Sequence, residues 1–144
     1  MWLCVDTPTS TDHRSSARER ASVAGRIAQD VVSCDSAILS LLVLDLEDGS
    51  EVLAVARSAR LPREEYATPL LVRKFGIAAA VVWGAAESAA QLLGRREFII
   101  GAFREQLVLM IGLREYDMLL AVRLSRSSNA EHIYAKIASL LGIG

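Results

Sequence analysis

The segment LVLDLEDGSEVLAVA, residues 42–56, contains two apolar runs on either side of an acidic turn that includes a glycine. Branched and aliphatic residues favour extended strands, and an Asp-Gly pair between two such runs is a strong hairpin signal. We therefore predict two antiparallel strands, at residues 37–46 and 51–57, joined at Asp48-Gly49.

Three more apolar segments follow closely on one another at residues 97–103, 106–113 and 118–124. The links between them are too short for a crossover, so these strands are also predicted to be antiparallel. Helical spacing of apolar residues, proline and glycine boundaries, and a Ser128 capping box with Glu131 predict helices at residues 15–33, 69–93 and 129–141. The expected fold is α+β: a five-stranded antiparallel sheet with helices on both faces, in the order α-β-β-α-β-β-β-α.

The length of 144 residues is that of one domain. Residues 6–16 are polar and include Pro8, so we expect a flexible N-terminal segment over residues 1–14, followed by a domain over residues 15–144. The first residues do not have the pattern of a signal peptide, and the longest apolar stretch without charge, residues 75–86, is too short to span a bilayer. A cytoplasmic protein without a membrane span is expected.

Composition indicates the kind of partner. Apolar residues make up 52% of the chain and the mean hydropathy is +0.31, which is high for a domain that stays alone in water. We expect part of this apolar surface to be buried against another copy or another protein. The net charge of −1 and the few aromatics, which are not interleaved with basic residues, argue against nucleic-acid binding.

Motifs that carry chemistry are missing from the sequence. The glycine-rich phosphate loops and the Gly-x-Ser-x-Gly motif do not occur, His13 and His132 are far apart, and Cys4 and Cys34 have no paired spacing. No catalytic residue, cofactor or metal site is therefore expected, and the protein is predicted not to be an enzyme. The acids at residues 45, 47 and 48 are expected to form a solvated hairpin tip rather than a metal site.

The middle helix carries the strongest signal for association. Residues 77–86 are apolar all round, and small residues recur every four positions at Gly76, Ala80, Gly84 and Ser88. Such a stripe allows two helix backbones to approach closely. It could also pack tightly against the chain's own sheet. Because the strands are apolar on both faces, three helices are too few to cover everything, and we expect a twofold partner to supply the missing cover.

The strand–acid–glycine–strand segment at residues 42–56, the long small-residue helix and the three strands after it resemble the Roadblock family. This is the dynein light-chain roadblock type, with longin- and profilin-like relatives, and the resemblance covers residues 15–142. Residues 104–106 depart from it, because many members have a glycine-containing turn there. The resemblance implies a homodimer or heterodimer in which the long helices pair and the third strands meet edge to edge.

Family members typically scaffold or regulate small Ras-like GTPases, without catalytic residues of their own. The resemblance therefore implies a non-catalytic dimeric scaffold or regulatory module that binds itself and a small GTPase or related signalling partner. A small-molecule sensory domain, with a pocket between sheet and helix where Gly101 and Gly112 leave room, is the alternative. The expected interface residues are Gly76, Ala80, Val81, Trp83, Gly84, Ser88, Phe98, Ile99, Ile100 and Gly101.

Overall fold

A computed structural model of the chain describes residues 3–47, 51–61 and 69–143, with side chains described from residue 17 onward. The elements are α1 (Leu3–Cys34), β1 (Ile38–Asp45), β2 (Glu51–Arg57), α2 (Pro69–Ala85), α3 (Glu87–Leu93), β3 (Phe98–Ala102), β4 (Gln106–Leu113), β5 (Met118–Ser125) and α4 (Ala130–Leu141). The predicted order is confirmed, with α3 as an additional short helix. The hairpin tip at Asp48-Gly49 and the expected helix start at Thr68 lie outside the described residues.

The strands form one five-stranded sheet in the order β2-β1-β5-β4-β3, and every neighbouring pair is antiparallel. The register places Leu42 of β1 opposite Val55 of β2 on one side and Ala121 of β5 on the other. The predicted antiparallel sheet is therefore confirmed. β2 and β3 are its two edges.

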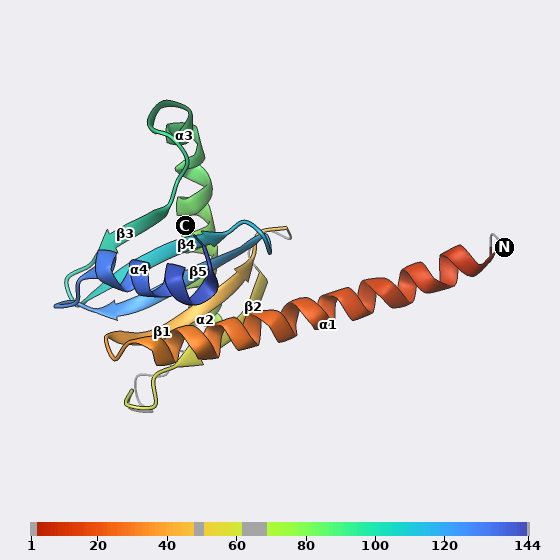
Figure 1. Ribbon diagram of the computed structural model, residues 1–144, viewed down its shortest axis with the longest axis horizontal. Helices are drawn as coiled ribbons and strands as arrows, with labels where there is room; N and C mark the ends of the chain where they lie inside the picture. Colours follow the sequence, from red (N-terminus) through yellow and green to blue (C-terminus); the bar gives the residue numbers. More distant parts are fainter. Residues whose placement is uncertain (1–2, 48–50, 62–68, 144) are drawn as a thin grey trace.

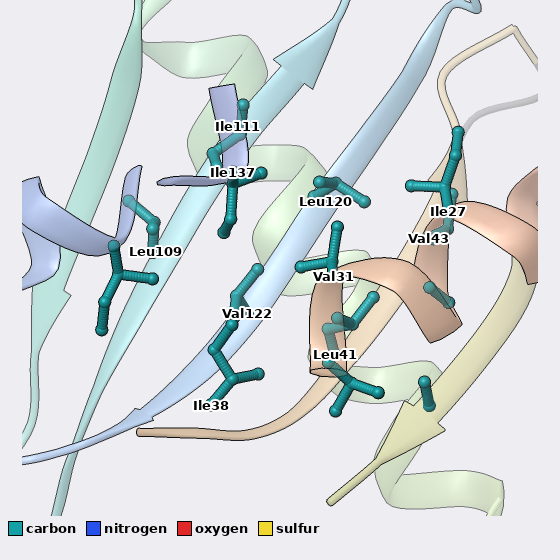
Figure 2. Close-up of a cluster of buried hydrophobic side chains, with 14 of the residues drawn as sticks. Ile27, Val31, Ile38, Leu41, Val43, Leu109, Ile111, Leu120, Val122 and Ile137 are labelled. Atoms are coloured by element: carbon teal, nitrogen blue, oxygen red, sulfur yellow. The ribbon is translucent and has the colours of Figure 1, made fainter. Parts of the chain in front are cut away.

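Helices cover both faces of this sheet (Figure 1). Alternate residues of a strand point to opposite faces. Leu41 and Val43 join the core beneath α1 and α4, whereas Leu42 and Leu44 join the core beneath α2. Figure 2 shows the first of these cores, with side chains from both helices meeting those of β1, β4 and β5. The continuous apolar runs in β1, β4 and β5 are explained by this burial on both faces.

α1 begins much earlier than residue 15. It starts at Leu3 and its N-terminal half extends beyond the sheet, so residues 3–14 are helical where a flexible segment was expected (Figure 1). Once a helix is nucleated, each added residue contributes one more backbone hydrogen bond, so a polar composition alone does not end it. The domain boundary at residue 15 stays a prediction.

The middle helix is interrupted, although one continuous helix over residues 69–93 was expected. The Ala89 amide donates to the carbonyl of Ala86 rather than to that of Ala85, and the Ser88 hydroxyl donates to the Ala85 carbonyl at 3.1 Å. A serine side chain that satisfies a backbone carbonyl in this way competes with the helical ladder. The predicted end at Gly94 is confirmed, where a positive φ of 99° favours glycine.

The cap of α4 differs from the prediction by one residue. Asn129, not Ser128, is the N-cap, and its side-chain oxygen accepts a hydrogen bond of 3.1 Å from the His132 amide. The Ser128 hydroxyl instead donates to the Ser125 carbonyl. Asparagine and serine are about equally good caps, so the sequence alone does not decide between adjacent candidates.

α1 is attached to the sheet by an ion pair that the sequence analysis did not predict. Asp45 was expected at a solvated hairpin tip, but it is only 7% exposed and accepts a hydrogen bond of 2.8 Å from Arg20 of α1. Arg20 also donates to the carbonyl of Tyr116, at 2.9 Å, in the turn between β4 and β5. One guanidinium therefore joins α1 to two neighbouring strand ends.

Candidate functional site

The inner side of α2 packs closely on the sheet through Gly76, Ala79 and Trp83, which are all buried. A Cβ added to Gly76 would lie 2.9 Å from Cδ2 of Leu44, and one added to Gly112 of β4 would lie 2.4 Å from Cζ2 of Trp83. Gly76 and Trp83 were expected at an interface between molecules, and both are buried against the chain's own sheet, which is the alternative packing considered above. Their contribution to an interface stays a prediction.

The small-residue stripe turns as it runs along the rod formed by α2 and α3. A step of four residues advances a helix by 400°, so the stripe rotates by about 40° at each step. Gly76 is buried, Ala80 is half-buried, and Gly84 and Ser88 are exposed. The stripe thus begins against the sheet and ends in solvent, which is why its members do not share one environment.

The outer side of α2 is apolar and exposed. It lies roughly opposite the sheet-facing residues on the helix, and Val81, at its centre, is 64% exposed. Exposed Lys74 also lies on this side. We call this surface the α2 outer face, and its large apolar residues are Leu70, Leu71, Ile77, Val81 and Val82.

The rod continues into α3, which projects away from the sheet (Figure 1). Its last two residues, Leu92 and Leu93, are 87% and 80% exposed. Val81 was among the predicted interface residues, but the other large apolar residues that are exposed on the rod were not. In the sequence, these residues could be recognised only by their position on the side of the helix opposite Trp83. That position is informative only when the side of the helix that faces the sheet is known.

β3 forms one edge of the sheet and pairs with β4 alone, so one side of its backbone has no neighbouring strand among the described residues. Phe98 is half-buried and its ring stacks on Tyr134 of α4, with 4.4 Å between centroids. Ile99 packs against the core beneath α2, whereas Ile100 is 38% exposed.

The end of β3 carries an exposed aromatic side chain. Gly101 is partly exposed, and the ring of Phe103 lies close beside it. Phe103 is 62% exposed and was not among the predicted interface residues. The structure thus divides those residues into a group held by its own chain (Gly76, Trp83, Phe98, Ile99) and a group available to a partner (Val81, Gly84, Ser88, Ile100, with Ala80 and Gly101 partly exposed).

Trp83 is held in place from outside the sheet. The guanidinium carbon of Arg96 lies 4.5 Å from the centroid of the Trp83 ring, and its Nη1 donates to the Trp83 carbonyl near the end of α2. Arg96 therefore contacts a backbone carbonyl near the C-terminal end of α2, not one at the end of α3.

The described residues do not form a cluster of metal-ligating side chains. In the described part of the chain, no group of three His, Cys, Asp or Glu side chains could hold a metal ion. One helical segment there, Pro69–Leu93, is long and apolar enough to cross a membrane by length and composition alone, although no membrane span was expected. α2 buries one side against its own sheet, but only 17% of the most apolar stretch of this segment is buried.

Comparison with known proteins identifies the fold. No protein-family model matches the chain, and no curated protein matches it. The solved structure of a Roadblock/LC7 domain from Streptomyces avermitilis superimposes with a TM-score of 0.63 at 15% identity, covering 81% of this chain and 89% of that one. The chain has a Roadblock-type fold.

Two structures of MglB support the same conclusion for the Roadblock-type fold. The gliding protein MglB from Thermus thermophilus gives a TM-score of 0.60 at 16% identity, with 86% of this chain and 90% of that one covered. An MglB structure with a tetrameric arrangement gives 0.63 at 18% identity, with 87% of each chain covered. The fold expected from residues 42–56 and from the element order is therefore confirmed.

Proposed function

We propose that this protein is a non-catalytic dimeric scaffold or regulatory module that acts by binding proteins in the cytoplasm. The observation that carries this proposal is the α2 outer face, where five large apolar side chains are at least 42% exposed on one side of one helix. Exposed apolar groups scattered singly are normal, but a contiguous set marks an interaction site. The same helix packs its other side on the sheet, and a partner would cover the outer side, which the described residues leave exposed.

The partner that fits this face best is a second copy of the chain. Gly84 has nothing within 4 Å of a built Cβ, and Ser88 is small and exposed, so the backbone of a second helix can approach the rod closely here. The β3 edge offers unpaired backbone groups that a second β3 could pair with across a twofold axis. A twofold dimer could use both the helix and this edge.

A small Ras-like GTPase, or a related signalling protein, is the further partner that we propose. This part rests on the resemblance of residues 42–56 and on the Roadblock-type fold, because relatives of this type serve as scaffolds or regulators of such GTPases. The resemblance to the Roadblock family implies no catalytic residue, so the module would act by contact with its partner.

The dimer is tested by light scattering on three variants at micromolar concentration. Val81→Glu places a charge at the centre of the α2 outer face, and Gly84→Arg places a long side chain where the single chain has room for it. Leu140→Glu makes the matched change at a residue of α4 that is 47% exposed. We expect a dimeric wild type and control, and monomeric but folded Val81→Glu and Gly84→Arg. A monomeric wild type would refute the dimer.

The GTPase is tested separately with purified small Ras-like GTPases from the same organism, each loaded with GDP or with a non-hydrolysable GTP analogue. We expect one of them to form a complex with the wild-type dimer that depends on the nucleotide, as measured by light scattering after gel filtration. If the chain is a dimer and none of these GTPases binds in either state, the GTPase part of the proposal is wrong and the dimer stands.

A further inference from the structure

α3 makes little contact with the body of the protein. It follows α2 closely, at Glu87–Leu93, and projects away from the sheet (Figure 1). None of its seven residues, all of which the structure describes, is buried. A helix this short is marginal on its own in water, so α3 needs support from elsewhere in the chain to stay formed.

That support comes from the segment that leads from α3 to β3. At the end of the helix, the amide of Gly94 donates to the carbonyl of Ala90, which is a local contact. Arg96 makes a longer-range one, because its Nη1 donates to the carbonyl of Trp83 in α2. This hydrogen bond joins the chain that follows α3 to the helix that precedes it. It therefore closes residues 86–95 into a loop whose two ends are held together.

The same contact reaches the sheet. The guanidinium carbon of Arg96 lies 4.5 Å from the centroid of the Trp83 ring, and this ring lies against Gly112 of β4. Gly112 follows Ile111, which pairs with Phe98 at the start of β3. The contacts that run from β3 through β4 to the Trp83 ring thus return to the chain at Arg96, just before β3. The base of α3 is attached to α2 and to the sheet at one point.

An arginine suits this position better than a lysine would. The last carbonyls of a helix lack partners within the helix, and the helix dipole also favours a cation near them. A planar guanidinium can donate to such a carbonyl and stack on an aromatic ring at the same time. An ammonium group is a point charge on a flexible stem, so it would hold the base of α3 less firmly.

We propose that Arg96 is the residue that positions α3 for the partner, a role that rests on the dimer proposed above. By holding the end of the loop against Trp83, it keeps α3 formed as the continuation of α2 before a partner binds. The second copy then meets Gly84 of α2 and Ser88 of α3 on one ordered rod. Without this contact, the partner would have to order residues 86–95 itself, and that ordering lowers the affinity.

The first test measures the dissociation constant of the dimer by sedimentation over a dilution series. Arg96→Met removes the guanidinium and keeps an unbranched side chain, whereas Arg96→Lys keeps the charge. Arg95→Met makes the matched change at the exposed arginine beside it. We expect the Kd to rise at least about tenfold in Arg96→Met and about threefold in Arg96→Lys, and to stay unchanged in Arg95→Met.

The second test asks whether α3 itself responds, by hydrogen exchange of its backbone amides. The variants are compared in the Val81→Glu background, so that a change in association does not alter the protection of α3. We expect the amides of residues 87–94 to exchange about tenfold faster in Arg96→Met than in the background, whereas those of β4 and β5 keep their rates. Arg95→Met should match the background throughout.

An unchanged Kd in Arg96→Met, with a dimeric wild type, would overturn the role of Arg96 and leave the proposed dimer standing. An equal rise in Arg95→Met would also overturn it, because the effect would then be one of charge alone, and so would α3 amides that exchange no faster in Arg96→Met. If Arg96→Met does not fold, an unchanged Kd in Arg96→Lys would overturn the proposal. A monomeric wild type would refute the dimer, and this role with it.

Discussion

Adding one methyl group at Gly112 tests the packing of α2 on the sheet. A Cβ at this position would lie 2.4 Å from Cζ2, 3.1 Å from Cε2 and 3.2 Å from Cη2 of Trp83. All three atoms belong to a rigid ring, which the guanidinium of Arg96 also contacts. The added methyl group in Gly112→Ala therefore forces the ring of Trp83, or α2 with it, to shift.

The expected cost follows from the size of this overlap. Overpacking a filled core by a methyl group costs about 1–3 kcal/mol, which for a chain of this length lowers Tm by about 3–10 °C. Gly76→Ala meets Cδ2 of Leu44 at 2.9 Å, which is the tip of a flexible side chain, so its cost is smaller. Gly25→Ala meets nothing within 4 Å inside α1 and should stabilise the protein by about 0.5–1 kcal/mol.

The series is measured by thermal and urea unfolding at one fixed protein concentration, because association would also raise the apparent stability. The expected order of stability is Gly25→Ala, wild type, Gly76→Ala, Gly112→Ala. A Gly112→Ala variant as stable as the wild type would refute the reasoning, because it would mean that Trp83 does not occupy the space above Gly112. If Gly25→Ala were less stable than the wild type, the free space around a glycine would not predict the effect of replacing it by alanine in this protein.

Three further changes probe single contacts. Arg20→Ala leaves Asp45 buried without its cation and should cost about 2 kcal/mol in urea unfolding; an unchanged midpoint would show that the ion pair contributes nothing. Asn129→Ala removes the N-cap of α4 and should cost about 1 kcal/mol in the same assay, against no change if the cap is not formed. Lys136 lowers the pKa of Asp35 below its usual 3.8, so this pair stabilises the fold above that pH and the stabilisation is lost as pH falls through the lowered pKa. The stability difference between wild type and Lys136→Met should therefore be present at pH 7 and vanish in strong acid, and a constant difference would contradict the assignment.

Much of the fold could be predicted from local patterns. The hairpin at residues 42–56 and the three later strands were found because apolar runs and turn residues act over a few positions. Two of the errors occurred where a side chain competes with the backbone for a hydrogen bond. Ser88 interrupts the middle helix and Asn129 replaces Ser128 as a cap, and such competition is decided by geometry rather than by residue type.

The candidate surface was predicted less well than the fold. The apolar middle helix with its small-residue stripe indicated that two sides of this helix must be buried. It did not indicate which of the two sides faces the sheet. Trp83 was assigned to a partner and in fact fills the space above Gly112. The ion pair of Arg20 with Asp45 joins residues far apart in the chain, so no spacing in the sequence points to it.

By itself, the sequence determined the class of fold, the order of its strands and helices, and an excess of apolar surface, because each of these depends on the kinds of residues that are neighbours along the chain. The tertiary structure decided which side of α2 is exposed, which glycine lies against the Trp83 ring, and which ion pair joins α1 to the sheet. These features depend on how each helix is rotated about its own axis against the sheet. That rotation is set by the packing of side chains throughout the core.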